Sequence, residues 1–390
     1  MNIRIPSSQL IEWVLEREDP LPWITYNEQI GRLELFMDNY MLSSYRVCPA
    51  YFFLRDVEGW HPRSALPGTE NTAERKWFLD FGILWHAMME EFYATFRSPA
   101  FSLEAFAIHT ADEYWHKLEM DQHLGHPECQ AIGGYLGFAG MLVAYAVQFS
   151  AENEKLIPIA SEIGFGRKKE VPLYVDDPLA VNEPAGLWSS ADIYLSGRLD
   201  LIFDDGYHIL PMDHKTMGSF RGDPMAKFLC DDGPTGYIYA LNKILPSLPG
   251  IGDEVATKRE CNMISMNLIR KGEAPKADPR QSRFKRMPIY KSSEALEAYK
   301  LRMIATCNHL INDLEMYVRG YSVPRNTNSC TNWYHTTCQY FDIHRQQSTD
   351  AERKTLATGY VKLPIWDTEK VGSIENQPIL AKAKAVGLKE

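Results

Sequence analysis

The sequence lacks the features that define several large classes of protein. It has no internal repeat and no low-complexity tract, and this argues against a fibrous or disordered chain. Its first residues lack the basic start, apolar middle and small-residue cleavage site of a secretory signal, so we expect a cytoplasmic protein. It also has no Gly-x-x-x-x-Gly-Lys-Ser/Thr run, the P-loop signature, and so shows no sign of a helicase.

The chain also has few cysteines and no net positive charge. Seven mostly scattered cysteines in 390 residues fit a reducing compartment better than a disulfide scaffold. Lys and Arg total 41 against 51 Asp and Glu, so net charge gives no indication of a nucleic-acid partner, although a local positive groove would suffice to bind one. The apolar run 131–149 contains Gln148 and several glycines, and we expect a buried helix there and no contact with a membrane.

The overall composition of the chain is that of a globular protein. With 45% hydrophobic and 24% charged residues, the chain can bury a large α/β core. We expect a helical lead-in over 1–40, a main domain over 41–345 with a helical insertion at about 97–155, and a peripheral tail over 346–390. Apolar residues at helical spacing predict a long buried helix from Glu74 to Phe96.

The stretch "GRLDLIFDDGYHILPMDHKT", residues 197–216, predicts a β-hairpin. Its apolar residues fall on odd positions before the turn and on even positions after it, so both sets share one face only if the loop is even. A two-residue turn at Asp205-Gly206 meets this condition, because Asp-Gly is a strong hairpin signal. Under that pairing Asp200 lies opposite Pro211.

The same pairing makes Asp213 a diagonal neighbour of Asp200, with Lys215 two residues further along the same face. Two carboxylates at that spacing could share one divalent cation beside an ammonium group, the arrangement that phosphodiester hydrolysis requires. The alternative is that these residues are solvent-side charges, with Asp213 and Lys215 forming an exposed ion pair that contributes little.

These motifs, in this order, resemble the PD-(D/E)xK nucleases, in particular the RecB-like branch that includes CRISPR-associated adaptation nucleases and the nuclease domains of recombination helicases. The resemblance covers about residues 42–345. It implies a restriction-endonuclease-like α/β fold: a mixed central sheet flanked by helices, here with a helical N-terminal part and a metal-clasped C-terminal segment.

The resemblance also implies roles for individual residues. His86 of "GILWH" becomes a metal ligand with Asp200 and Asp213, Lys215 assists the attacking water or stabilises the charge of the transition state, and "SEIGF" places Glu162 near the site. In "PTGYIYAL", Tyr237 matches the family's tyrosine as a substrate contact, but Gly233 replaces its glutamine. Taken singly, His86 and Tyr237 have a simpler interpretation as packed core residues.

A cysteine pattern near the C-terminus suggests a second metal site. Cys330, Cys338 and His344 have ligand spacing, and Cys48 lies far upstream. In some of the resembling nucleases four cysteines in this arrangement hold an iron-sulfur cluster, which implies a 4Fe-4S cluster here with zinc as the alternative. His335 is another candidate for the fourth ligand, and the three cysteines are otherwise ordinary buried thiols.

The functional expectation is therefore a Mg²⁺- or Mn²⁺-dependent deoxyribonuclease. It would act as an exonuclease or end-processing enzyme on single-stranded DNA or duplex ends, in recombination, repair or phage and defence DNA metabolism, with a helicase or recombination protein as a possible partner. Arg283, Lys285 and Arg286 are candidates for lining the strand path. The alternative is a catalytically inactive nucleic-acid-binding or assembly protein that retains the fold.

Overall fold

A computed structural model of the chain describes residues 6–63, 70–166, 173–176, 191–218, 224–248, 261–271, 283–330, 337–346 and 348–365. These residues form two compact units, each built from segments that are distant in the sequence. The first unit lies within Met1–Thr72, Phe165–Gly197 and Glu294–Val371, and the described part of the second lies within Ala73–Gly164 and Arg198–Ser293.

The second unit is organised around a five-stranded mixed sheet. Its strand order is β10-β9-β8-β7-β4. Strand β9 runs antiparallel to β10 and parallel to β8, and β8 runs antiparallel to β7. The strands are β4 (Ile157–Phe165), β7 (Gly197–Asp204), β8 (Ile209–Met217), β9 (Met263–Arg270) and β10 (Phe284–Tyr290).

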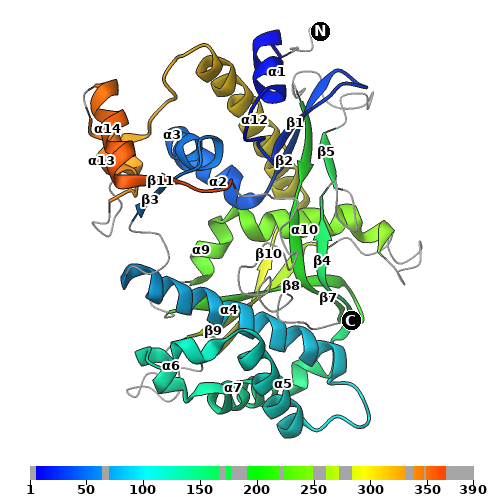
Figure 1. The fold of residues 1–390 in the computed structure, drawn as a ribbon. Helices are drawn as coiled ribbons and strands as arrows, with labels where there is room; N and C mark the ends of the chain where they lie inside the picture. Colours follow the sequence, from blue (N-terminus) through cyan, green and yellow to red (C-terminus); the bar gives the residue numbers. More distant parts are fainter. Residues whose placement is uncertain are drawn as a thin grey trace. The chain divides into compact units, whose positions relative to one another are not determined.

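Helices cover both faces of this sheet. Successive residues of a strand point to opposite faces, and on β8 Thr216 lies against Gly82 of α4 while Lys215 lies beside Tyr237 of α10. Figure 1 shows α10 on one side of the strands and α4, α5 and α7 on the other. The sheet flanked by helices confirms the predicted fold class. The helices are α4 (Glu70–Thr95), α5 (Leu103–Lys117), α6 (Pro127–Ile132), α7 (Gly134–Gln148), α8 (Ser150–Asn153), α9 (Pro224–Cys230) and α10 (Asp232–Ile244).

The apolar run expected to form a buried helix is α7. Its residues Phe138, Leu142 and Tyr145 are fully buried, and it packs against α5. In the described part of the chain, no helix has the length and apolarity needed to cross a membrane.

The β7–β8 hairpin forms, but its turn differs from the predicted one. Ile202, and not Asp200, pairs with Pro211, and the last pair before the turn joins Asp204 to Ile209. The loop is therefore two residues longer than the expected Asp205-Gly206 turn, and both extra residues follow Gly206. The Asp205 carboxylate stabilises this longer loop by accepting hydrogen bonds from two of its backbone amides.

The shift in pairing changes how the acidic residues meet. Because the loop gains two residues, its length remains even and the apolar face of the hairpin is the expected one. Continuing the observed register places Asp200 directly opposite Asp213, where a diagonal position was predicted. Opposed residues are closer than diagonal ones, so the correction brings the two carboxylates nearer to each other.

The first unit contains a smaller sheet, with strand order β1-β2-β6-β5. The expectation of a helical lead-in over 1–40 holds only for α1 (Ser8–Leu15), because β1 (Ile24–Asn27) and β2 (Arg32–Met37) form a hairpin. Gly31 ends the turn with a φ of 67°, a conformation that suits glycine. The remaining elements are α2 (Asn39–Val47), α3 (Pro49–Phe52), the π-helix η1 (Phe53–Val57), β3 (Trp60–Pro62), β5 (Tyr174–Asp176), β6 (Ala191–Leu195), α12 (Ser293–Val318), η5 (Thr327–Ser329), α13 (Phe341–His344), α14 (Thr349–Gly359) and β11 (Tyr360–Lys362).

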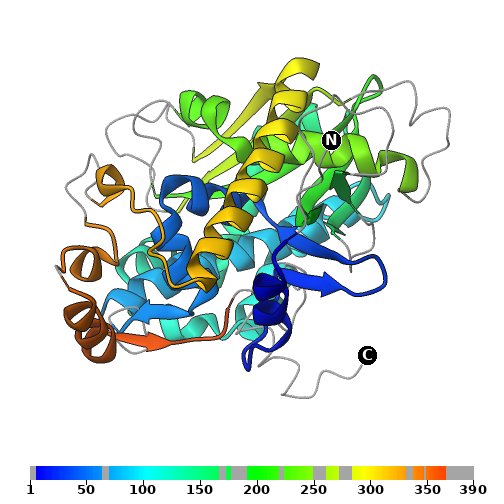
Figure 2. The ribbon, with the colours of Figure 1, turned by 90° about the horizontal axis from the view of Figure 1, so that it is seen from above.

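The segment after residue 346 is not a peripheral tail throughout. Strand β11 pairs antiparallel with β3, and Figure 2 shows the two strands side by side. Tyr340, Ile343 and Tyr360 form a buried cluster that packs against Tyr51 and Trp60. Early and late parts of the first unit are thus joined by backbone pairing and by aromatic packing. Residues 366–390 lie outside the described part.

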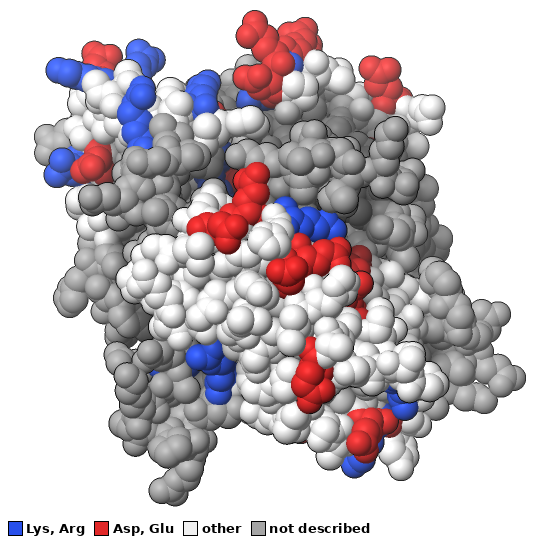
Figure 3. Space-filling model, turned by 60° about the horizontal axis from the view of Figure 1, so that its bottom comes forward, with Lys and Arg blue, Asp and Glu red and all other residues white. Residues whose placement is uncertain are grey.

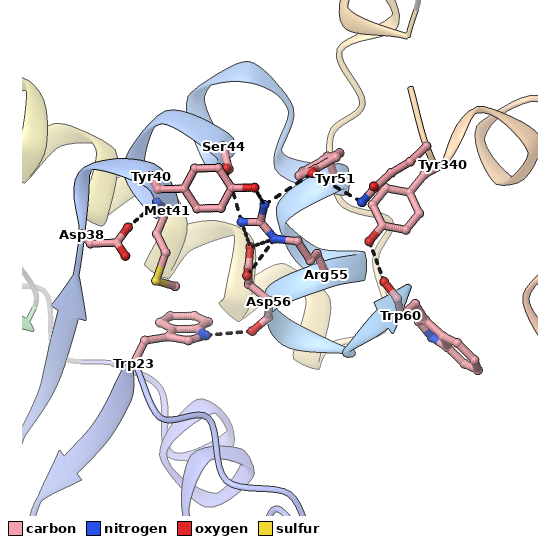
Figure 4. A network of polar contacts seen from close by, with 11 residues as sticks. Trp23, Asp38, Tyr40, Met41, Ser44, Tyr51, Arg55, Asp56, Trp60 and Tyr340 are labelled. Atoms are coloured by element: carbon pink, nitrogen blue, oxygen red, sulfur yellow. Dashed lines mark hydrogen bonds and ion pairs between the residues drawn. The ribbon is translucent and has the colours of Figure 1, made fainter. Parts of the chain in front are cut away.

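A buried polar network lies next to this cluster (Figure 4). The Arg55 guanidinium pairs with the Asp56 carboxylate and donates to the hydroxyl groups of Tyr40 and Tyr51. Asp56 is 2% exposed, and its backbone carbonyl accepts a hydrogen bond of 2.7 Å from the Trp23 indole. A buried carboxylate of this kind depends on its partner, because removal of the partner leaves an uncompensated charge.

We predict that Arg55→Met lowers the free energy of unfolding by about 3–5 kcal/mol, the usual loss when one member of a buried ion pair is removed. Urea denaturation followed by circular dichroism measures the change. Arg353→Met is the matched control, because the Arg353 and Asp350 side chains are 77% and 96% exposed. The control should change stability by no more than about 0.5 kcal/mol. Equal effects of the two substitutions would show that the Arg55 network is not stabilising.

Candidate active site

Three chelating side chains converge in the second unit from three different elements. His86 comes from α4, Glu162 from β4 and Asp200 from β7, and their ligand atoms all lie within 4.8 Å of one another. The His86 Nδ1 atom is 3.5 Å from an Asp200 oxygen and 4.0 Å from a Glu162 oxygen. Within the described residues this is the one group of three such side chains.

Asp213 and Lys215 lie on β8, the strand next to β7. Asp213, expected as a metal ligand, is not one of the three residues whose ligand atoms lie within 4.8 Å of one another, and Glu162 is. Asp213 is 3% exposed, and its Oδ1 atom accepts a hydrogen bond of 2.9 Å from the Lys215 ammonium group. The Lys215 side chain is 44% exposed, so it connects the buried carboxylate to solvent. The Asp200 Oδ2 atom accepts a hydrogen bond of 2.8 Å from the backbone amide of His214, which holds β7 and β8 together at the site.

The carboxyl groups influence one another's ionisation. Burial and the neighbouring Asp200 carboxylate raise the pKa of Glu162 to about 8, although Arg198 opposes this shift. Burial also raises the pKa of Asp213, and the Lys215 ammonium group only partly offsets it. For Asp200, burial acts in the same direction, but His86 and Lys215 outweigh it and the pKa lies below its ordinary value. The site therefore favours fewer negative charges than it has carboxyl groups.

A divalent cation fits this set of residues. The His86 Nδ1 and Asp213 Oδ2 atoms are buried and have no hydrogen-bond partner among the described residues. A buried polar atom without a partner is costly, and a metal ion is one of the ways to satisfy it. Carboxylate oxygens with one imidazole are ligands suited to Mg²⁺ or Mn²⁺.

Comparison with known proteins identifies the family. The model of the PD-(D/E)XK nuclease superfamily matches residues 40–340, which is most of the 390-residue chain and includes every residue of the cluster. The chain belongs to the PD-(D/E)XK nuclease superfamily. The resemblance inferred from the motifs is thereby confirmed at the level of the superfamily, whose members are metal-dependent nucleases. A search of curated proteins found no match.

In this member of the PD-(D/E)XK superfamily, Tyr237, the predicted substrate contact, lies on α10 beside Lys215. The Lys215 Nζ atom is 5.9 Å from the centre of the Tyr237 ring. Gly233, which replaces the family's glutamine, lies in the first turn of α10, where its amide donates to the helix-capping Asp231 side chain. The glycine therefore contributes a backbone contact in the helix cap and no side chain toward the site.

The structure also shows a polar network that sequence reasoning missed. His214 is 3% exposed, and its Nδ1 atom is 2.7 Å from the Asn267 amide nitrogen. That amide nitrogen donates to the Tyr145 hydroxyl at 2.9 Å. The His214 ring also lies edge-to-face with His86, with centroids 5.8 Å apart. Burial lowers the pKa of His214 to about 3, so the imidazole is neutral beneath the metal-ligand cluster.

One residue of this network corrects an expectation. Arg286 was a candidate for the strand path, but its side chain is 9% exposed and donates to the hydroxyls of Tyr93 and Tyr145 at 3.1 and 2.7 Å. Position 286 lies on the inward face of β10, because its neighbour Lys285 is exposed. The rest of the basic loop, 272–282, lies outside the described residues. On the face in Figure 3, the coloured Lys and Arg side chains form no continuous band.

The predicted cysteine set lies in the first unit, and the structure brings part of it together. The Cys330 Sγ atom is 3.6 Å from His344 Nδ1, and the Cys338 amide donates to the Cys330 carbonyl at 2.8 Å. Burial raises the pKa of the Cys330 and Cys338 thiols, and nearby Cys48 adds to the effect on both. No three of these four side chains have ligand atoms within 4.8 Å of one another. His335 lies outside the described residues.

We predict that Tyr145→Phe lowers the free energy of unfolding by about 1–3 kcal/mol, because the substitution removes a buried hydroxyl that accepts hydrogen bonds from both Arg286 and Asn267. Thermal or urea denaturation measures the loss. Tyr207→Phe is the matched control, since Tyr207 is 79% exposed, and it should change stability by less than about 0.5 kcal/mol. A Tyr145→Phe protein as stable as the wild type would mean that the network contributes nothing.

Proposed function

We propose that this protein is a metal-dependent deoxyribonuclease that hydrolyses phosphodiester bonds as an exonuclease or end-processing enzyme. The observation that carries the proposal is the convergence of His86, Glu162 and Asp200 within 4.8 Å, next to the Asp213–Lys215 pair. Membership of a nuclease superfamily supports hydrolysis. The choice of DNA ends, and of recombination, repair or defence as the setting, is supported by the motif resemblance to the RecB-like branch.

The proposed role of each residue follows from its chemistry. His86, Asp200 and Asp213 would hold Mg²⁺ or Mn²⁺, and Glu162 is close enough to His86 and Asp200 to add a further oxygen. When bound, the cation supplies Lewis-acid activation of water and offsets negative charge at phosphorus. Lys215 donates to Asp213 and extends toward solvent, where it can orient a water molecule or stabilise charge in the transition state.

The proposed role of Tyr237 is to contact the substrate, and the position of its ring near the Lys215 ammonium group supports this role. A partner protein would have to open duplex DNA, since the sequence has no P-loop motif. We therefore propose that the enzyme acts on single strands or duplex ends, alone or with a helicase or recombination protein.

We predict that Asp213→Asn and Lys215→Met each reduce cleavage of end-labelled DNA with Mn²⁺ by about 10²–10⁴-fold or more, because one removes a ligand charge and the other a cation at the reacting phosphate. DNA affinity, measured with Ca²⁺ to prevent turnover, should change much less. Asp112→Asn, at an exposed position on α5, is the matched control and should cleave like the wild type.

Two outcomes would contradict the proposal. Wild-type protein that binds DNA but leaves single strands and duplex ends intact with both Mg²⁺ and Mn²⁺ would favour the inactive binding or assembly protein. Cleavage that survives both substitutions would show that hydrolysis takes place elsewhere.

For the first unit we propose a second metal site held by Cys48, Cys330, Cys338 and His344, with a 4Fe-4S cluster as the occupant and zinc as the alternative. Two features support it. Cys330 and His344 are already in contact, and the His344 Nε2 atom is buried without a hydrogen-bond partner among the described residues. A coordinating thiol is deprotonated by the cation itself, so the burial that raises the pKa of Cys330 and Cys338 does not prevent them from binding a metal ion.

We predict that protein purified without oxygen contains stoichiometric iron and sulfide with broad visible absorption, or stoichiometric zinc without it. Cys330→Ser should lose most of the bound metal. Cys230→Ser is the matched control, because Cys230 is exposed on α9 and far from this motif in the sequence, and it should retain the metal. Wild-type protein without either metal, or Cys330→Ser protein that keeps it, would exclude this site.

A further inference from the structure

A pocket of about 330 Å³ opens next to the metal-ligand cluster in the second unit. Its lining includes His86 and Glu162 of the cluster, together with Arg198, Glu90, Gly82 and Leu79. Its volume lies at the lower end of the range found for small-ligand sites. The pocket therefore has room for a part of the substrate beyond the scissile bond.

Arg198 is the permanent cation of this pocket's lining. Its Nε atom pairs with a Glu162 oxygen at 2.6 Å, and its side chain is 24% exposed. The closest contact between Arg198 and Glu162 is made by Nε. The Glu90 carboxylate, which also lines the pocket, interacts with Arg198 electrostatically. A guanidinium presents its N–H donors as a planar fork. Such a fork matches the oxygens of a phosphate in a way that lysine does not.

The partner of Arg198 has an unusual backbone. Glu162 lies within β4 but has a φ of 54°, in the left-handed region that strands avoid. Such a conformation is unfavourable in a residue other than glycine and persists where the surroundings impose it. The observed outlier turns the Glu162 side chain toward both His86 and Arg198. Glu162 therefore links the metal-ligand cluster to the arginine.

The spacing along β7 indicates which phosphate Arg198 reaches. Arg198 and Asp200 are two residues apart on one strand, so their side chains leave the same face about 7 Å apart. This distance is comparable to the separation of consecutive phosphates in a nucleic-acid strand. A strand with its scissile phosphate beside Asp200 would place the next phosphate beside Arg198.

We propose that Arg198 binds the phosphate next to the scissile one and that Glu162 is a positioning residue that holds the guanidinium fork in place. This inference rests on the proposed nuclease function and adds a subsite to it. The competing explanation is that Arg198 only neutralises Glu162. In that case it would affect the metal-ligand cluster and would have no relation to any particular phosphate.

The test is a substitution cycle between protein and substrate. One uncharged methylphosphonate is moved along a short single-stranded oligonucleotide, and cleavage with Mn²⁺ is measured for wild type, Arg198→Met and Arg198→Lys. In the wild type, a methylphosphonate next to the cut should raise KM by about ten- to a hundredfold, because a charge-assisted contact is lost. Arg198→Met should raise KM similarly on the normal substrate and be insensitive to the modification.

Three further measurements separate the explanations. The Mn²⁺ affinity of Arg198→Met, measured by calorimetry, should match that of the wild type, and its DNA binding should depend less steeply on salt by about one phosphate contact. Arg198→Lys should recover the charge but only part of the KM. Lys155→Met, which removes an exposed positive charge in the turn before β4, should behave as wild type in every assay.

An unchanged methylphosphonate penalty in Arg198→Met, or a loss of Mn²⁺ affinity equal to that of Glu162→Gln, would overturn the inference while leaving nuclease activity intact. If the wild type cuts no oligonucleotide, the proposed function fails separately, and the same cycle is measured on DNA affinity with Ca²⁺. Absence of any coupling there, or of any binding, would overturn the Arg198 subsite as well.

Discussion

The central constraint on the candidate active site is the close approach of three carboxyl groups on adjacent strands of the sheet. Glu162, Asp200 and Asp213 come from β4, β7 and β8, which are neighbours in the sheet. Charges of one sign repel strongly when they are removed from water. Lys215 and Arg198 compensate part of this charge through contacts of 2.9 and 2.6 Å. Full ionisation would still leave an excess of negative charge, and a divalent cation is the natural complement to it.

The two faces of β8 differ in charge: one presents a cation near the carboxylates and the other a neutral imidazole. Lys215 approaches Asp213 on the side of α10. On the other side His214 stacks on Tyr93 of α4, and Asn267 links it to Tyr145 of α7. Because His214 is uncharged, it can lie under the cluster without competing with a cation for the carboxylates. Its hydrogen bond to Asn267 connects β8 to β9, so the strand that carries Asp213 and Lys215 is held by side chains as well as by the sheet.

Much of this arrangement could be predicted from the sequence, because it follows from periodicity. The alternation of apolar residues in 197–216 is enough to place Asp200 and Asp213 on neighbouring strands, and the helical spacing in α4 is enough to identify its buried face. His86 lies outside that face, with its side chain 25% exposed. The exact register could not be predicted, because parity distinguishes even from odd loops but not two residues from four. That choice was made by the side chain of Asp205, which caps the longer loop.

Other features depend on tertiary contacts that leave no local pattern. From the sequence, Glu162 is expected to be an ordinary strand residue. Only the structure shows its left-handed backbone conformation and its ion pair with Arg198. Arg286 belongs to a basic stretch of the sequence that predicts a loop. In the structure it lies on β10, and its side chain donates hydrogen bonds to two tyrosine hydroxyls. The β1–β2 hairpin was not predicted, because its strands are short and lie in a segment that was expected to be helical.

A metal ion at the proposed cysteine site would stabilise the first unit only near the site itself. Its early and late segments are already joined by β3–β11 pairing, by the Tyr340 cluster and by a hydrogen bond from the Ala50 amide to the Pro324 carbonyl. None of these contacts requires a metal ion. A cation bound at Cys48, Cys330, Cys338 and His344 would therefore be needed chiefly to hold sulfur atoms that repel one another as thiolates. Its loss should disturb the segment around Cys330 and His344 before it separates the two ends of the unit.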